Sequence, residues 1–186
     1  MSNVRQPESV SDLSSQEAAI QEQVHLAPYE PAWPELFSQE RERLLSLFTQ
    51  LLAVEHFGST AVPGMAAKPI IDILAGVASM KAADALFEPV LAAGYTTSRE
   101  FNAMLADRRW FMRSSQGRRT HHLHVVVHHG PVWAERLRFR DLLRGDTSLA
   151  HSYSQLKSEL AVRFQHDREA YTDAKAEFVA AALAVA

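Results

Sequence analysis

One aspartate, Asp72, interrupts the otherwise apolar stretch PIIDILAGV at residues 69–77. In a β-strand, side chains alternate between the two faces, so Asp72 shares a face with Ile70 and Leu74. Burying an ionised carboxylate costs free energy unless a cation or hydrogen-bond donors compensate it. Two interpretations follow from this pattern. Asp72 binds a cation at the edge of a site, or it is a structural residue that caps backbone N–H groups or forms a salt bridge.

Two histidines, His122 and His124, occur one residue apart in the stretch RTHHLHVVV at residues 119–127. On a strand they project to the same face. Imidazole can ligate a metal ion, hydrogen-bond a phosphate group or act as a base near neutral pH. The structural alternative is one histidine with satisfied hydrogen bonds and one exposed histidine. Together with the aspartate, the pair predicts a site in which Asp72, His122 and His124 act as catalytic residues or metal ligands.

The residues Gly58, Ser59 and Thr60 form a turn of small side chains directly after the apolar run LAVEHF. Such a turn offers backbone N–H groups and two hydroxyls, which together can hold phosphate oxygens. Lys68 lies in the same loop and adds one positive charge. These four residues are candidates for phosphate binding. The structural alternative is an ordinary turn followed by an ordinary exposed lysine.

Arginines are concentrated between residues 99 and 119. Guanidinium groups form paired hydrogen bonds with phosphate and carboxylate groups. Most of these arginines fit the exposed surface of a hairpin. Arg109 and Arg113, which share a face of a regular strand, and Arg119, next to the histidines, are the better candidates for binding a phosphorylated substrate.

The elements that must position these residues are predicted from the hydrophobic pattern. Strands are expected at residues 52–57, 69–76, 108–114 and 119–127, the last two forming a hairpin with Gly117 in its turn. Helices are expected from Pro34 to about Gln50, over 79–94 with a kink at Pro89, and over 131–145, 149–164 and 168–184. Strands and helices alternate early and helices dominate late. This order predicts an α+β fold, a small mixed, mostly antiparallel sheet flanked by helices, with a helical C-terminal part.

Composition and charge exclude several classes of protein. The 186 residues include no cysteine, which excludes disulfides, thiolate metal sites and a cysteine nucleophile. A net charge of −3, without a series of aromatic residues for stacking on bases, makes a nucleic-acid partner unexpected. Residues 1–23 are polar and predict a flexible tail before a folded domain at 24–186. No segment resembles a signal peptide or a membrane helix, which predicts a cytoplasmic protein with no membrane partner.

Several stretches together resemble the GrpB family, also called UPF0157. They are HFGSTAVPGMAAKPIIDILAGV, RRWFMR, RTHHLHVV, FRDLLR and DREAYTDAKAEFV, and the resemblance covers roughly residues 24 to 186. It implies a fold similar to that of the nucleotidyltransferase superfamily. The family also occurs as a domain fused to dephospho-CoA kinase in some bacteria. The resemblance implies no single reaction.

The superfamily pattern is a Gly-Ser turn, then a strand with two acids one residue apart, then a third acid on a later strand. In that pattern two divalent ions clamp the triphosphate and activate the attacking hydroxyl. Gly58 and Ser59 match the turn and Asp72 matches the first acid, but Leu74 occupies the second acid position. The later strand offers His122 and His124. The resemblance thus implies one divalent metal, with Mg²⁺, Mn²⁺ and Zn²⁺ left open, because magnesium prefers oxygen and the other two accept imidazole.

Two hypotheses of function remain. The first is a nucleotidyltransferase-like protein that binds a nucleotide or another phosphorylated small molecule with a divalent metal. The second is a non-catalytic module for a nucleotide- or CoA-type ligand that kept the fold and lost transfer activity. Leu74 favours the second, whereas the retained polar residues favour the first, since buried polar groups without partners destabilise a fold.

Overall fold

The computed structural model describes residues 23–185, and its centre is one four-stranded sheet of order β1-β2-β4-β3. Its strands are β1 (Ala53–Phe57), β2 (Ile71–Val77), β3 (Arg108–Ser115) and β4 (Arg118–Val127). The pairs β1–β2 and β3–β4 are antiparallel, and β2–β4 is parallel. The predicted α+β fold, mixed sheet and hairpin are confirmed. Of the predicted tail, residues 1–22 lie outside the described residues.

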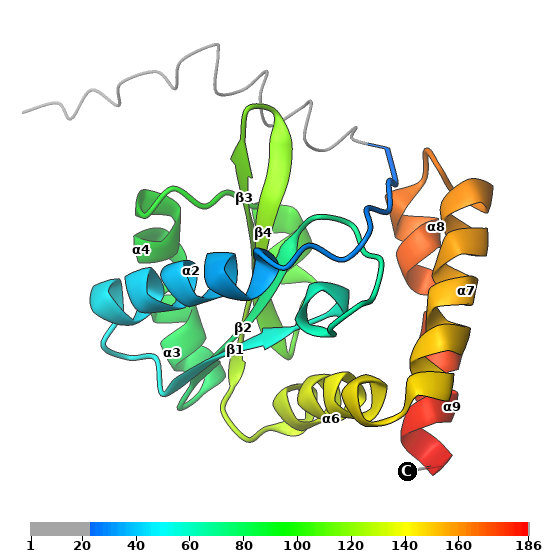
Figure 1. The fold of residues 1–186 in the computed structure, drawn as a ribbon. Coiled ribbons are helices and arrows are strands. Elements are labelled where there is room, and N and C mark those ends of the chain that lie inside the picture. The colour runs from blue at the N-terminus through cyan, green and yellow to red at the C-terminus, as the bar shows by residue number, and fades with distance from the viewer. Residues whose placement is uncertain (1–22, 186) are drawn as a thin grey trace, which may run out of the picture.

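One face of the sheet carries the main hydrophobic core. Ile71, Ile73 and Ala75 of the central strand β2 point into it, as their alternation requires. Three helices cover this face (Figure 1). They are α2 (Trp33–Leu47), α3 (Met80–Ala85) and α4 (Phe87–Ala92). Helix α2 ends three residues before the predicted Gln50, because Phe48 and Leu51 turn inward to join the same core.

The predicted helix at 79–94 is in fact two helices, α3 and α4, separated at Leu86. The reason is Pro89, which has no N–H to donate to the carbonyl four residues earlier. Restarting the helix at Phe87 places Pro89 in a first turn, where that donor is not needed. A short helix that the pattern did not predict, α5 (Arg99–Ala103), follows and is capped by the Ser98 hydroxyl.

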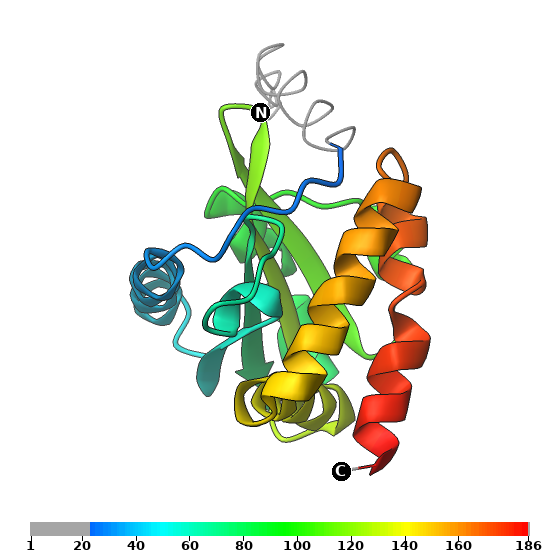
Figure 2. The ribbon, with the colours of Figure 1, turned by 45° about the vertical axis from the view of Figure 1, so that its right-hand side comes forward.

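The C-terminal helices form a layer on the opposite side of the sheet from α2 (Figure 2). They are α6 (Pro131–Gly145), α7 (Thr147–Arg163), α8 (Arg168–Asp173) and α9 (Ala176–Val185). Trp133 of α6 packs against Leu74 of β2 and Val126 of β4. The predicted single helix at 168–184 is also wrong, because the chain breaks between α8 and α9 around Lys175. Within residues 23–185, no helix combines the length and apolar character needed to span a membrane.

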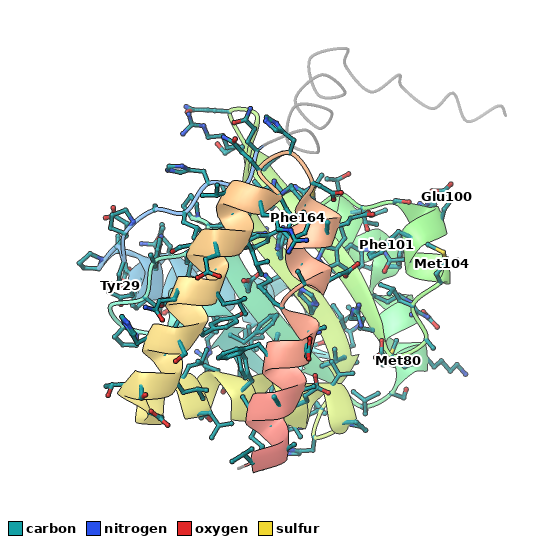
Figure 3. All side chains as sticks on the ribbon, turned by 90° about the vertical axis from the view of Figure 1, so that its right-hand side faces the viewer. Tyr29, Met80, Glu100, Phe101, Met104 and Phe164 are labelled. Atoms are coloured by element: carbon teal, nitrogen blue, oxygen red, sulfur yellow. The ribbon has the colours of Figure 1, made fainter. Side chains whose placement is uncertain are left out.

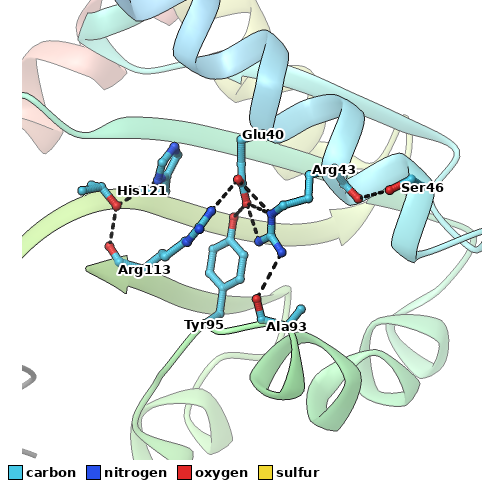
Figure 4. Close-up of polar contacts among 8 residues, drawn as sticks. Glu40, Arg43, Ser46, Ala93, Tyr95, Arg113 and His121 are labelled. Atoms are coloured by element: carbon cyan, nitrogen blue, oxygen red, sulfur yellow. Dashed lines mark hydrogen bonds and ion pairs between the residues drawn. The ribbon is translucent and has the colours of Figure 1, made fainter. Parts of the chain in front are cut away.

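A buried carboxylate, Glu40, ties the α2 layer to the sheet (Figure 4). Its side chain is 4% exposed and accepts hydrogen bonds from Arg43 at 2.6 Å, Arg113 at 2.7 Å and Tyr95 at 2.6 Å. Burial alone would raise the pKa of Glu40, but these donors and the two positive charges hold that pKa below its usual value. Arg113, predicted from its strand face as a functional candidate, therefore has a structural role.

We predict that Glu40→Gln lowers the free energy of unfolding by about 2 kcal/mol near pH 7, because two arginines lose their charged partner. The depressed pKa of Glu40 contributes stability above its unfolded value, and this contribution disappears as the pH falls through the folded value. Denaturant unfolding at several pH values should therefore show the deficit of the variant shrinking in acid. Glu42→Gln, at an exposed position of the same helix, is the control and should cost little at any pH. An equal loss in both variants would contradict this assignment.

Candidate functional site

Parallel pairing of β2 with β4 places Asp72 directly beside His122, and Leu74 beside His124. Neighbouring residues in a sheet point to the same face, so Asp72, His122 and His124 share one face of the sheet. The His122 Nδ1 and Asp72 Oδ1 atoms are 3.0 Å apart, a hydrogen-bond distance. The Asp72 side chain keeps 28% of its surface exposed and His122 keeps 13%. The pair is therefore enclosed but open to a ligand at the carboxylate.

The charge states of this pair follow from their surroundings. Burial alone would raise the pKa of Asp72, but the hydrogen bond from His122 and the positive charge of Lys68 keep it below the usual value. Burial lowers the pKa of His122, so this ring is neutral at pH 7. Facing an ionised carboxylate, a neutral imidazole carries its proton on Nδ1, and we assign this tautomer from the contact.

The remaining ring nitrogen of His122 is a lone-pair acceptor without a partner. Its Nε2 atom is buried, and the described part of the chain offers it no hydrogen bond. Buried polar atoms are normally satisfied, so an exception of this kind calls for an explanation. A carboxylate that orients a histidine so that its other nitrogen is free is the arrangement used for metal ligands and general bases.

His124 does not join this pair directly. Its ring lies edge-on to Phe57 at 5.1 Å between centroids, and burial lowers its pKa to about 3. Among residues 23–185, no group of three or more His, Asp or Glu side chains is placed to hold a metal ion. The metal set of Asp72, His122 and His124 therefore stays a prediction. The free Nε2 atom of His122 lies on the far side of the ring from Asp72, so the carboxylate alone would hold a divalent ion that takes its other ligands from water and phosphate, as magnesium usually does.

The Gly58 turn touches the Asp72 carboxylate. Gly58 has φ +73°, and a Cβ added there would overlap Asp72 Oδ2. Glycine is thus required twice, by the backbone conformation and by the close approach. Ser59 follows in the 3₁₀ helix η1 (Ser59–Ala61) and is half-buried. The Thr60 hydroxyl, by contrast, is buried between His56 Nε2 at 3.0 Å and the Ile70 carbonyl at 3.2 Å. Thr60 therefore supports the turn and has no hydroxyl to spare for phosphate.

The two arginine candidates lie on opposite faces. Arg109 pairs with Val125, away from Asp72, and its guanidinium binds Asp84 at 2.7 Å. The structure does not bring it to the site. Arg119 reaches the Asp72 face because of a β-bulge, where the register shifts between Arg113 and Ser114. Bulges of this kind re-aim a side chain.

The position of Arg119 links the hairpin to the histidine pair. Its guanidinium lies 6.0 Å from the centroid of the Trp110 ring, and that ring lies 5.4 Å from the ring of His122. Arg119 also contributes to the low pKa of His122 through its positive charge, after the larger effect of burial. Of the predicted site residues, the candidate site keeps Gly58, Ser59, Lys68, Asp72, Arg119 and His122, with His124 two residues further along β4. Thr60 and Arg109 do not contribute to it.

Residues of the C-terminal helices complete the surroundings and were not predicted. Figure 3 views the molecule from the side of these helices, where side chains fill the space between them and the sheet. The Lys68 Nζ atom lies 4.9 Å from the centroid of the Tyr171 ring in α8, and the Lys175 Nζ atom lies 4.2 Å from the same centroid. Both Tyr171 and Lys175 belong to DREAYTDAKAEFV, so their place in a quoted motif was the available signal.

Comparisons of the sequence and of the fold with known proteins all point to the same family. The family model described as GrpB protein matches residues 23–184. The UPF0157 protein YqkA of Bacillus subtilis is 38% identical over 157 residues, which cover 84% of this chain and 45% of that protein. The glutamate-rich protein GrpB of Alkalihalophilus pseudofirmus is 34% identical over 166 residues, covering 84% of this chain and 92% of that protein. The chain thus spans nearly all of one relative and less than half of the other.

A solved structure shares the fold. The crystal structure of the conserved protein GrpB from Enterococcus faecalis superposes with a TM-score of 0.74 at 33% sequence identity. The match covers 87% of this chain and 98% of that chain. The sheet and the C-terminal helical layer therefore belong to one shared architecture.

We predict that Gly58→Ala destabilises the protein by about 2 to 4 kcal/mol, because its methyl group both strains the backbone and displaces Asp72. Gly64→Ala is the matched control, since Gly64 also has positive φ but nothing lies within 4 Å of an added Cβ. The control should lose only the backbone contribution of about 1 to 2 kcal/mol. Chemical denaturation measures both variants. Equal losses would mean that the Asp72 contact contributes nothing.

Proposed function

The chain belongs to the GrpB family, and from its own site we propose that it is a nucleotidyltransferase-like protein that binds a nucleotide or phosphate ester with a divalent metal ion. The observation that carries this proposal is the hydrogen-bonded pair of Asp72 and His122, with its unpartnered Nε2 atom. The family resemblance supplies the class of ligand. The neighbouring glycine turn and positive charges agree with an anionic ligand.

Each residue of the site has a distinct role in the proposal. Asp72 would hold a divalent metal ion, which would supply positive charge to neutralise the phosphate of the ligand. His122 would accept a proton from an attacking hydroxyl at Nε2, the ring nitrogen that does not face Asp72. The backbone of Gly58 and the Ser59 hydroxyl contact phosphate oxygens. Arg119 and Lys68 balance the charge of the ligand.

A second candidate, a non-catalytic ligand-binding module, is favoured by one observation. Leu74, at the position of the second acid in the superfamily pattern, is completely buried against Phe57, Val126 and Trp133. A carboxylate there would be enclosed by apolar side chains and costly. A two-metal arrangement on β2 therefore conflicts with the packing of this chain, and binding without transfer is the simpler use of the site.

We predict that Asp72→Asn weakens Mn²⁺-dependent nucleotide binding at least tenfold, because the amide has no charge for the metal. Asn can still accept the hydrogen bond from His122, so the unfolding temperature should change little. Isothermal titration calorimetry with ATP, in the presence and absence of Mn²⁺, measures the effect. Asp84→Asn, on the other face of the sheet, is the control for loss of a carboxylate. If Mn²⁺-dependent binding of ATP were identical in wild type and Asp72→Asn, the proposal would be wrong.

The same protein distinguishes the two candidates. After prolonged incubation of wild type with Mn²⁺ and each of the four common nucleoside triphosphates, with water as the acceptor of the nucleotidyl group, an enzyme should release pyrophosphate and the nucleoside monophosphate in equal amounts, and Asp72→Asn should not. Nucleotide that is bound but recovered unchanged favours the binding module.

A further inference from the structure

We propose that Lys68, Lys175 and Tyr171 form an anion subsite that receives a chain of linked phosphate groups. The subsite deepens the proposed function and rests on it only for the identity of the rest of the ligand. It narrows the ligand from phosphate esters in general to molecules that carry two or more phosphates in a row.

The geometry that supports the subsite is two ammonium groups on one aromatic ring. Lys68 comes from the loop before β2, and Lys175 comes from the junction of α8 and α9. Their Nζ atoms lie 4.9 and 4.2 Å from the centroid of the Tyr171 ring. Tyr171 is 1% exposed and packs against Val24 and Leu160, so the ring is a fixed platform. Lys68 and Lys175 are more than a hundred residues apart in the sequence, yet the fold places their two positive charges at the same aromatic ring.

Neither lysine has an anionic partner. In the stretch 23–185, no carboxylate forms an ion pair with Lys68 or Lys175. Cation–π contact attracts an ammonium group but does not neutralise it. Two half-buried ammonium groups that form no ion pair are unfavourable, so the arrangement favours binding of an anion.

A third lysine in the same region shows what a structural lysine looks like. Lys157 of α7 is 2% exposed and donates a hydrogen bond to the Ala66 carbonyl, which holds the helix against the loop before β2. Its Nζ also lies 5.2 Å from the centroid of Tyr153. Lys68 and Lys175 have no such carbonyl acceptor among the contacts of the described chain. Their ammonium groups are therefore available to a ligand.

The surrounding charge indicates more than one phosphate. Burial and the positive charges of Lys175 and Arg168 lower the pKa of Lys68 to about 7. Burial likewise lowers the pKa of Lys175 to about 8. The negative charge of Asp72 has the opposite effect and raises the pKa of both Lys68 and Lys175. The charged groups that act on one or both of these lysines include Asp72, Arg119, Arg136, Arg168 and Lys157, and Lys175 also acts on Lys68. The two ammonium groups that form no ion pair carry positive charge that a polyphosphate, with its several negative charges, would match.

The break between α8 and α9 explains how Lys175 reaches this place. Helix α8 ends at Asp173 and α9 begins at Ala176, so Lys175 lies on the connecting residues. The amide of Lys175 still donates to the Thr172 carbonyl at 3.3 Å, which keeps the connection tight. The side chain is thereby directed to the Tyr171 ring one turn earlier in the chain.

The test is isothermal titration calorimetry of the full chain with sodium tripolyphosphate and with inorganic phosphate, in EDTA so that no metal contributes. Wild type should bind tripolyphosphate at least tenfold more tightly than phosphate. Lys175→Gln should lose about tenfold in tripolyphosphate affinity. Lys81→Gln, an exposed lysine of α3 beyond the other face, is the matched control and should bind as wild type. Equal affinity of Lys175→Gln and wild type for tripolyphosphate would overturn the subsite.

Proton uptake and stability provide independent readouts. A bound anion raises the pKa of both lysines, so binding at pH 8 should take up protons, seen as different apparent enthalpies in two buffers of different ionisation enthalpy. Uptake should disappear near pH 5.5, where both lysines are already charged. Lys175→Gln should unfold at the same temperature as wild type or above it, because one of two repelling charges is gone. A marked loss of stability would instead assign Lys175 a structural role and count against the subsite.

Failure of the subsite and failure of the proposed function are distinguishable. Asp72→Asn in EDTA should bind tripolyphosphate at least as tightly as wild type, since a negative charge is removed. If that holds while metal-dependent nucleotide binding ignores Asp72, the lysine subsite stands and the metal proposal falls. If Lys175→Gln leaves tripolyphosphate binding unchanged while Asp72→Asn abolishes nucleotide binding, the subsite falls and the metal proposal stands.

Discussion

The parallel pairing of β2 with β4 is the constraint on which the site depends. It brings Asp72 and His122 to adjacent positions on one face, within hydrogen-bond distance. A carboxylate between isoleucines would otherwise be an unpaired buried charge. The imidazole compensates it on one side, and the Gly58 turn leaves room for it on the other. A shift of one residue in the register would send Asp72 into the main apolar core and the pair would be lost.

The sheet carries a polar cluster on each face, and the contrast between them separates structure from function. On the α2 face, Glu40 is matched by Arg43, Arg113 and Tyr95, and every donor has its acceptor. That balance stabilises the fold and leaves nothing for a ligand. On the other face, the ionised Asp72 carboxylate lies near Lys68, both Lys68 and Lys175 form no ion pair within the described chain, and the Nε2 atom of His122 lacks a partner. Imbalance of charge, rather than the number of polar groups, marks the second cluster as the site of binding.

The sequence predicted the strands and the shared face of His122 and His124, because a period of two residues is a local property. It could not predict effects that depend on distant contacts. Side chains of a regular strand alternate between the two faces, but the β-bulge in the hairpin interrupts this alternation. The bulge therefore determines the face on which Arg119 lies. Thr60 was predicted to bind phosphate because its neighbours in the sequence do not show that its hydroxyl already forms hydrogen bonds with His56 and the Ile70 carbonyl. Lys175 was missed because its meeting with Lys68 exists only after the C-terminal helices pack on the sheet.

The most direct test of this account is a crystal structure of the chain with Mn²⁺ and a non-hydrolysable nucleoside triphosphate, with anomalous scattering to locate the metal. The account predicts the anomalous peak in contact with the Asp72 carboxylate and the terminal phosphates between Lys68 and Lys175. The groove on the opposite side of the sheet, lined by Asp84, Arg99 and Arg109 among others, should be free of nucleotide. A nucleotide bound in that groove, or a metal ion placed away from Asp72, would contradict the account.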